Sequence, residues 1–225
     1  MRNGAGGLHI PDGFLDVYWV GATYIVTIGY FAYLSLSHQL VLDSSRVSLV
    51  TTLAAAIFAA QMLNWPLPGG TSLHLLGGAL AGIILGPSYG SVTLALVLLV
   101  QALVFHDGGL TTLGANILNM GIVAVLVGYY VFKYALRISG KVSRGSIFMA
   151  GLLAGWMSVF IAGVVCGVEI GLSPQFPYGV EVTIPVMGGW HFILGIVEGI
   201  ITGFVLSHPH ARNPELIVAL KEAGG

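Results

Sequence analysis

Residues 147–168 read IFMAGLLAGWMSVFIAGVVCGV, an apolar run without a single charged side chain. Because a helix that spans a bilayer needs about 20 mostly apolar residues, this stretch predicts a transmembrane helix. The rest of the 225-residue chain agrees, since only 8% of its residues are charged and its mean hydropathy is +0.92. A typical soluble domain has about 25% charged residues, and fewer charges cannot cover its surface. The composition therefore predicts an all-α integral membrane protein.

The composition also excludes several other classes of protein. The chain is too apolar for disorder, and its one cysteine, Cys166, cannot build a disulfide scaffold. A net charge of −1 without a basic patch argues against a nucleic-acid partner. The sequence has no P-loop and no HExxH or CxxC motif, so neither ATP hydrolysis nor a metalloprotease is indicated. An intramembrane enzyme is disfavoured because no nucleophile–base pair can be identified.

Together with residues 147–168, about seven segments of the chain are apolar enough to cross a membrane. They are Val17–Leu36, Val47–Leu63, Ser72–Leu85, Ser91–Val104, Asn116–Phe132, Ile147–Val168 and Trp190–Leu206. The third and fourth are short and are joined by a tight turn at 86–90, so they could instead form one broken or re-entrant hairpin. We expect a single transmembrane domain over residues 8–207, an N-terminal extension at 1–7 and a tail at 208–225.

The loops between these segments predict the orientation. With seven spans, one side of the membrane holds seven of the eight basic residues: Arg46, Lys133, Arg137, Lys141, Arg144, Arg212 and Lys221. The opposite side holds only Arg2, together with most of the acidic loop residues. The positive-inside rule then places the N-terminus outside and the C-terminal tail in the cytoplasm.

Small residues recur at every fourth position in several predicted helices. Examples are Gly78, Gly82 and Gly86, then Gly163, Gly167 and Gly171, then Gly195, Gly199 and Gly203, with Ala55, Ala56, Ala59 and Ala60 in the second span. This spacing lets helix backbones approach closely in lipid. It indicates internal packing, or a face that docks another membrane subunit.

Polar side chains gather at the outer end of the predicted bundle. They are His74, Gln101, His106, Asp107, Asn116, Asn119 and His191, with His9 and Asp12 of the N-terminal segment. Such groups are costly at a bilayer and usually mark a substrate path, and imidazole is a good ligand for Ni, Co and related metals. Glu198 lies two helical turns deeper than His191. It is either a structural hydrogen-bond acceptor or a group that couples protons or ions to transport.

Three motifs resemble a known family. Residues 8–15, LHIPDGFL, resemble the N-terminal Met-His-Ile-Pro-Asp-Gly signature of the CbiM/NikM family, the substrate-binding (S) subunits of energy-coupling-factor (ECF) transporters for cobalt and nickel. Residues 70–78, GTSLHLLGG, resemble its second motif, and residues 191–198, HFILGIVE, resemble its last helix. The matches follow in order over nearly the whole chain, and the family's bundle has the seven-span layout with the N-terminus outside.

The resemblance implies a metal site made of nitrogen ligands. Carried over, these are the N-terminal amine of residue 8, the amide and imidazole of His9, and the imidazole of His74. Four nitrogens in a plane suit Ni(II) or Cu(II), and binding should weaken in acid because the ligands must be deprotonated. The polar residues Gln101, Asn116, Asn119, His191 and Asp12 either orient these ligands or form interhelical hydrogen bonds.

The chain departs from the family pattern at its N-terminus. Residues 1–7 precede the motif, and Leu8 stands where the initiator Met is expected. With these residues attached, residue 8 has no free amine. We expect translation to start at position 8, on a leucine-type codon read as Met. If the extension is real, His9 and His74 would need a carboxylate such as Asp12 or Asp107, or water, to complete the site.

The resemblance implies a subunit for uptake of Ni(II) or Co(II) in the plasma membrane of a prokaryote, with the metal as substrate and no organic cofactor. Its partners would be a transmembrane coupling protein (EcfT-type), two cytoplasmic ATPases, a small accessory membrane subunit and membrane lipid. The alternative is a stand-alone secondary transporter that couples metal uptake to protons through Glu198. Neither reading makes the chain an enzyme, and the choice between nickel and cobalt stays open.

Overall fold

A computed structural model describes residues 9–40, 44–67, 71–208 and 217–223. In chain order the elements are α1 (Val17–Leu36), α2 (Ser44–Gln61), β1 (Asn64–Leu67), β2 (Thr71–His74), α3 (Gly78–Leu85), α4 (Pro87–Val104), α5 (Leu113–Asn116), the π-helix η1 (Ile117–Val123), α6 (Ala124–Ser139), α7 (Arg144–Leu172), α8 (Val180–Ser207) and α9 (Val218–Ala223). The predicted helical membrane fold is confirmed. The structure adds one two-stranded antiparallel hairpin, in which Asn64 of β1 pairs with His74 of β2.

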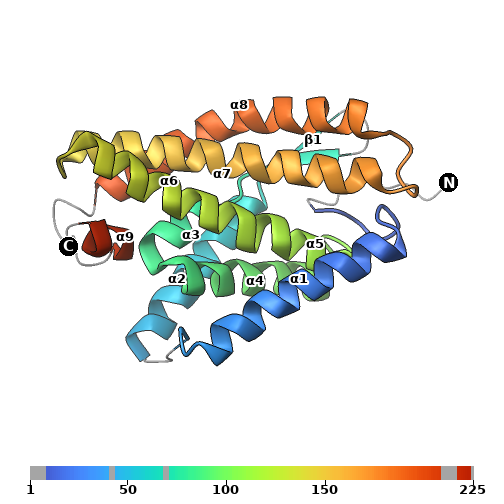
Figure 1. Cartoon of the computed structure of the whole chain (residues 1–225), viewed down its shortest axis with the longest axis horizontal. Helices are drawn as coiled ribbons and strands as arrows, with labels where there is room; N and C mark the ends of the chain where they lie inside the picture. Colours follow the sequence, from blue (N-terminus) through green and yellow to red (C-terminus); the bar gives the residue numbers. More distant parts are fainter. Residues whose placement is uncertain (1–8, 41–43, 68–70, 209–216, 224–225) are drawn as a thin grey trace.

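Helices α7 and α8 form a close pair along one side of the bundle (Figure 1). A Cβ added at Gly151 would lie 2.8 Å from Cα of Gly203, and a Cβ at Gly155 would lie 2.8 Å from Cα of Gly199. Because such contacts are too short for a real side chain, the glycine spacing brings the two backbones together. Internal packing, the first interpretation of this pattern, is confirmed for these two helices.

Helix α3 packs against α6 in the same way, at the centre of the bundle. Ala124 fits against Gly78, where an added Cβ would meet its methyl carbon at 2.7 Å. In the other direction Ala79 fits against Gly128. Buried apolar side chains on both helices, among them Ile83 and Phe132, continue this contact into the largest core cluster.

The expected helix over 72–85 is wrong in its first half. Residues 71–74 form a strand, residues 75–77 a short loop, and α3 begins only at Gly78. The chain then reverses at Gly86, which has a φ of +80°, and Pro87 starts α4. Since Gly90 would touch the backbone of Gly82 if it carried a Cβ, α3 and α4 form a hairpin, as the alternative interpretation allowed.

Five stretches of the described helices are long and apolar enough to cross a membrane, so the count of seven spanning helices is not confirmed. The eight-residue α3 is about 12 Å long at 1.5 Å per residue, too short to cross alone. Helices α7 and α8 are longer than expected, because α7 continues to Leu172 and α8 begins at Val180.

Residues 217–223 pack against α3 and α6 of the bundle. Residues Ile217 and Leu220 are buried in the core cluster with α3 and α6, at the end of the molecule where α9 lies in Figure 1. The end of the chain that was expected to be a cytoplasmic tail therefore includes a short packed helix.

Candidate functional site

The N-terminal segment is fastened to the start of α5. Asn116 holds the backbone of Ile10 on both sides, since its Oδ1 accepts from Ile10 N–H at 3.0 Å and its Nδ2 donates to the Ile10 carbonyl at 3.2 Å. The N–H of Gly109 and the hydroxyl of Thr112 donate to the same carbonyl. Asn116 thus positions the residue next to His9 through its backbone.

Asp12 accepts hydrogen bonds from the loop that precedes α5. Its Oδ1 accepts from the N–H of Thr111 at 2.7 Å and from the hydroxyl of Thr111 at 2.5 Å. Burial alone would raise the pKa of Asp12, but these bonds and backbone contacts at 110 and 112 outweigh it, so its pKa lies below the ordinary 3.8. Asp12 therefore anchors the segment, and its Oδ1 is occupied by Thr111 and not by the histidines.

Two glycines make room for this segment. Gly108 has a φ of +89°, and a Cβ there would lie 2.9 Å from Cβ of His9. A Cβ at Gly109 would collide with the backbone nitrogen of Asp12. Only glycine permits so close an approach.

His9 and His74 come together although they are 65 positions apart in the sequence. Their ring centroids are 4.8 Å apart with the planes at 61°, and both residues are buried, at 7% and 6% exposure. Within the described parts of the chain, neither ring nitrogen of His9 has a hydrogen-bond partner. Its Nδ1 faces the Oδ1 of Asp107 at 3.5 Å. Because a buried polar atom without a partner is costly, these nitrogens suit a ligand.

His74 presents its other nitrogen in a defined state. Its Nδ1 lies 2.9 Å from the Leu75 carbonyl, which can only accept, so Nδ1 carries the proton and Nε2 keeps a lone pair. The pKa of His74 is lowered to about 3, mainly by burial and secondly by the nearby His9. The hydrogen bond to the Leu75 carbonyl acts in the opposite direction but is the smaller effect. The imidazole is therefore neutral at physiological pH, as a metal ligand must be.

The loop that follows His74 rests on Glu198 of α8. The N–H of Leu76 donates to Oε2 at 2.6 Å, and the N–H of Gly77 donates to Oε1 at 2.8 Å. On the other side of the loop, Gln61 Nε2 of α2 donates to the Leu76 carbonyl at 2.7 Å. Both carboxylate oxygens accept hydrogen bonds, so Glu198 acts here as the structural acceptor that one of the sequence interpretations predicted.

His191 sits on α8 in a notch left by Gly163. A Cβ at Gly163 would collide with the imidazole carbon Cγ of His191, so no larger residue fits opposite the ring. Its Nδ1 donates to the Met187 carbonyl at 2.7 Å, which leaves Nε2 with a lone pair. His191 also contributes, as a smaller cause, to the lowered pKa of His74, so the two rings lie in one electrostatic neighbourhood.

Asn119 and Gln101 lie apart from these contacts. Asn119, in the π-helical turn η1, donates to Glu169 Oε2 at 2.6 Å and thereby joins η1 to α7. Of the two roles predicted for Asn119, this is the interhelical hydrogen bond and not the orientation of a metal ligand. Gln101 is fully buried, and its side-chain amide has no partner among the described residues. The backbone carbonyl of Gln101 accepts a hydrogen bond from the N–H of Asp107. The Gln101 backbone therefore shapes the turn that carries the Asp107 carboxylate.

Sequence reasoning missed Glu169 and Gln61. The predicted helix Ile147–Val168 leaves Glu169 in the following loop, but Glu169 is 2% exposed inside α7. The apolar residues Ile170 and Leu172 after it indicate that the helix continues. Gln61 drew no attention because a single amide near the end of an apolar helix carries no motif.

The described side chains do not complete a metal site by themselves. In the ranges that the structure covers, no group of three or more His, Cys, Asp and Glu residues lies close enough to hold an ion. Leu8, whose amine is an expected ligand, lies outside the described residues. His9 and His74 can supply two imidazole nitrogens.

Comparisons with known proteins agree on one family. The family model described as "Cobalt uptake substrate-specific transmembrane region" matches residues 9–216. A putative fused nickel transport protein NikMN of Archaeoglobus fulgidus is 50% identical over 210 residues, 93% of this chain and 68% of that protein. A putative metal transport protein of Haloquadratum walsbyi is 43% identical over 93% of both chains. The crystal structure of a transition metal transporter superimposes with a TM-score of 0.82 at 32% identity, covering 90% of this chain and 92% of the other.

Proposed function

The chain belongs to the CbiM family of nickel and cobalt transport membrane proteins, and from this premise we propose that it is the substrate-binding subunit of an energy-coupling-factor transporter. In this role it captures Ni(II) or Co(II) from the extracytoplasmic side of a prokaryotic plasma membrane. The observation that carries the proposal is the buried contact between His9 and His74, in which His9 Nε2 has no partner among the described residues and His74 Nε2 keeps a lone pair.

The proposed ligands are the amine of residue 8, the amide and imidazole of His9, and the imidazole of His74. Two features support this set. The segment that carries His9 is fixed through Ile10, and the loop that carries His74 is fixed through Glu198, so both imidazoles are held before metal arrives. A planar set of four nitrogens favours Ni(II), which makes nickel the first ion to test and cobalt the second.

The energy for transport would come from partners: an EcfT-type coupling protein, two cytoplasmic ATPases and a small accessory membrane subunit. Two surfaces offer places to dock. Ala55, Ala56 and Ala59 of α2 are exposed, so a helix of a partner could approach the α2 backbone closely. The basic segment 133–146, expected on the cytoplasmic side, could meet a soluble partner.

Transport by the isolated chain tests this proposal against the secondary carrier. The purified chain is reconstituted into liposomes with a pH gradient imposed, and entry of Ni(II) is followed with a metal-sensitive dye inside. We expect stoichiometric binding but no gradient-driven accumulation. Sustained accumulation that follows the pH gradient would replace the S-subunit proposal with the carrier, and Glu198→Gln would then abolish it.

The free-amine model needs its own experiment. Ni(II) affinity is measured by titration calorimetry for the chain that begins at residue 8 and for the full chain. We expect the affinity to collapse when residues 1–7 are present, because they remove the amine. Equal affinities would refute the amine as a ligand and favour the site completed by Asp107 or water. Intact-mass measurement of the native protein decides where its mature N-terminus lies.

A further inference from the structure

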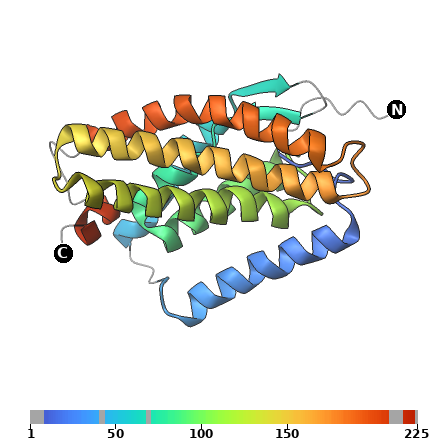
Figure 2. The same cartoon turned by 45° about the horizontal axis from the view of Figure 1, so that its top comes forward.

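Glu169 and Asn119 form a second buried polar cluster, separate from the two histidines. Glu169 lies in the last turn of α7 and is 2% exposed, and Asn119 lies in η1 and is 4% exposed. Figure 2 shows α7 running between α8 and α6, the helix that continues η1. Asn119 Nδ2 donates to Glu169 Oε2 at 2.6 Å. Among the described residues, the other two oxygens of the pair, Asn119 Oδ1 and Glu169 Oε1, have no partner.

The surroundings of this pair are apolar. Ile170, which follows Glu169, packs in one core cluster with Ile10, and Met120, which follows Asn119, packs in another. An ionised carboxylate in this place would lose its hydration and keep a single amide donor. That arrangement is costly, because a buried charge needs a counter-charge or several hydrogen bonds.

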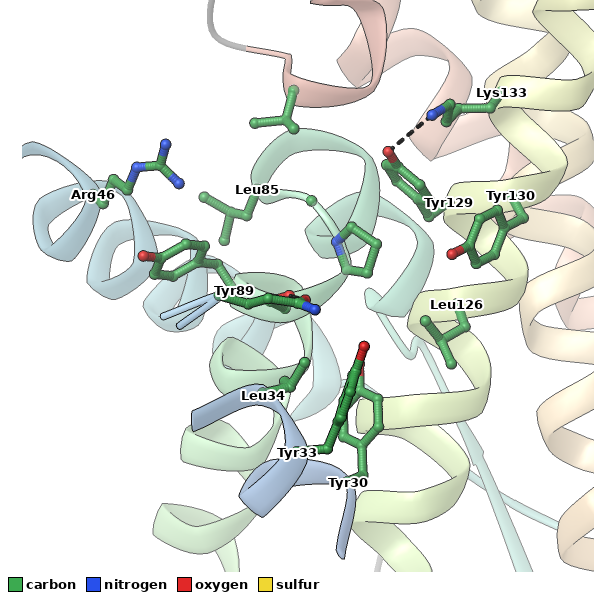
Figure 3. A pocket seen from close by; sticks show the side chains of 15 residues that line it. Tyr30, Tyr33, Leu34, Arg46, Leu85, Tyr89, Leu126, Tyr129, Tyr130 and Lys133 are labelled. Atoms are coloured by element: carbon green, nitrogen blue, oxygen red, sulfur yellow. Dashed lines mark hydrogen bonds between the residues drawn. The ribbon is translucent and has the colours of Figure 1, made fainter. Parts of the chain in front are cut away.

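The described Lys and Arg side chains lie too far away to supply the counter-charge. Arg46 and Lys133 line a cavity of about 660 Å³ at the opposite end of the bundle (Figure 3). Arg144 begins α7, 25 positions before Glu169, which corresponds to about 37 Å along the helix at 1.5 Å per residue. The remaining two lie in the last turn of α6 and in its connection to α7: Arg137 and Lys141.

The elements packed around the Glu169 end of α7 carry other titratable side chains. They are Cys166 on α7, Tyr178, Glu181 and His191 before or on α8, and His9, Asp12 and Asp16 in the N-terminal segment. The segment η1 carries none. None of these groups is a permanent cation, so they do not balance a negative charge on Glu169.

We propose that Glu169 and Asn119 form a proton-binding site, in which Glu169 is a neutral carboxylic acid at neutral pH. A proton on Oε1 removes the charge and supplies the missing donor, since the new O–H can donate to Asn119 Oδ1. The two planar groups are then joined by a pair of hydrogen bonds. A metal ion fits less well, because the described residues place no group of three His, Cys, Asp and Glu side chains here.

The bound proton fastens η1 to α7 behind the segment that carries His9. Asn116, one turn before Asn119, holds the Ile10 backbone, so the two asparagines join that segment and α7 to the same stretch of chain. Asn119 is part of a π-helical turn, because its carbonyl accepts from the N–H of Ala124 five positions later. Such turns are rare and frequently occur at functional sites.

Infrared difference spectroscopy of the full chain in lipid bilayers, without metal, tests the proposal. The C=O band of a protonated carboxylic acid is separate from the bands of carboxylates and amides. At neutral pH we expect this band in the wild type and its loss in Glu169→Gln. Glu181→Gln, which removes an exposed carboxyl group from α8, is the matched control and should keep the band. Identical wild-type and Glu169→Gln spectra in this region would show that Glu169 is ionised, and would overturn the proposal.

Thermal unfolding against pH gives a second readout. Glutamine at position 169 can donate to Asn119 Oδ1 and accept from Nδ2, so at neutral pH the Tm of Glu169→Gln should equal or exceed that of the wild type. An exposed glutamic acid is ionised at neutral pH, so folding of the wild type takes up a proton from solvent at this site. The wild-type Tm should therefore fall relative to that of Glu169→Gln as the pH rises, by at most about 5 °C for each pH unit.

Replacing sodium by choline in the buffer should change neither Tm. A Glu169→Gln variant that is less stable than the wild type at every pH would show that the site needs an ionised carboxylate. Stabilisation by sodium that disappears in Glu169→Gln would show a bound cation. Either result would overturn the proton site.

Discussion

The two ends of the bundle share helices α1, α4 and α6 but are closed in different ways. At the histidine end, hydrogen bonds join segments that are distant in sequence: Ile10 to Asn116 across 106 positions, and Leu76 to Glu198 across 122. At the opposite end the same helices leave a cavity of about 660 Å³ lined by tyrosines and two cations. One end is fixed by hydrogen bonds between distant segments, and the other contains an open cavity.

The difference follows from where irregular backbone occurs. In the 75–77 loop Leu76 is buried, so its N–H and C=O groups need partners inside the protein, and Glu198 and Gln61 supply them. The turn at Gly86 lines the cavity at the opposite end of the bundle, and its reversal rests on the positive φ of a glycine. This comparison predicts that changes at the histidine end alter metal binding, and that changes at the open end do not.

The largest effect is expected for His74→Ala. It removes a ligand that the fold holds neutral and oriented, so Ni(II) affinity should fall by more than about 100-fold. The comparison gives the control, since Arg46→Gln/Lys133→Gln at the open end should bind Ni(II) like the wild type. Titration calorimetry measures both variants. Nearly unchanged affinity in His74→Ala would remove this histidine from the proposed site.

Next comes Glu198→Gln, which tests whether the loop needs its carboxylate. The amide oxygen can accept from only one of the two N–H groups, and the amide NH₂ would face the other. A buried unsatisfied donor costs about 1–3 kcal/mol, so we expect Ni(II) affinity about tenfold lower, with the stoichiometry unchanged.

Glu181→Gln is the matched control, because Glu181 lies exposed in the first turn of the same helix. If Glu181→Gln lost as much Ni(II) affinity as Glu198→Gln, the negative charge of α8, and not the contact of Glu198 with the loop, would determine the affinity.

The sequence predicts the long helices well and the site loop poorly. Apolar runs alone give α1 at Val17–Leu36 and most of α7, because the bilayer requires about 20 such residues wherever the chain crosses it. The run over 72–85 is equally apolar, yet it splits into strand, loop and short helix. Pairing with β1 and the carboxylate of Glu198 decide that outcome, and hydropathy contains neither.

The candidate site shows the same limit. Motif resemblance and polarity pick out His9, His74 and Glu198, because polar groups are rare in so apolar a chain. The partner of each group lies elsewhere in the sequence and follows only from the packing. The sequence predicts Asn116 near the ligands but not its hydrogen bonds to the Ile10 backbone. It predicts the end of the helix at Val168, four residues before the observed end at Leu172, and therefore leaves Glu169 in a loop.

A smaller effect is expected for Asn116→Ala. This change leaves the N–H of Ile10 without its partner, while the Ile10 carbonyl keeps Gly109 and Thr112. Because only one group is orphaned and the Ile10 carbonyl keeps two donors, Ni(II) affinity should fall about threefold to tenfold. Gln39→Ala at the open end is the control and should change nothing. A loss as large as that of His74→Ala would mean that Asn116 contacts the metal.

The smallest effect is expected for Asp12→Asn, because Asp12 is exposed and water competes with its bonds to Thr111. The amide oxygen can still accept one of these bonds, so Ni(II) affinity near pH 7 should fall by no more than about twofold.

The direction of the pH effect follows from the lowered pKa of Asp12. Its contribution to holding the segment is present above about pH 3.8, the ordinary value, and is lost as the pH falls through the lowered pKa. Acid unfolding without metal, followed by circular dichroism, should therefore begin at a higher pH in Asp12→Asn than in the wild type. Coincident acid transitions, together with a large loss of Ni(II) affinity, would instead make Asp12 a ligand and not an anchor.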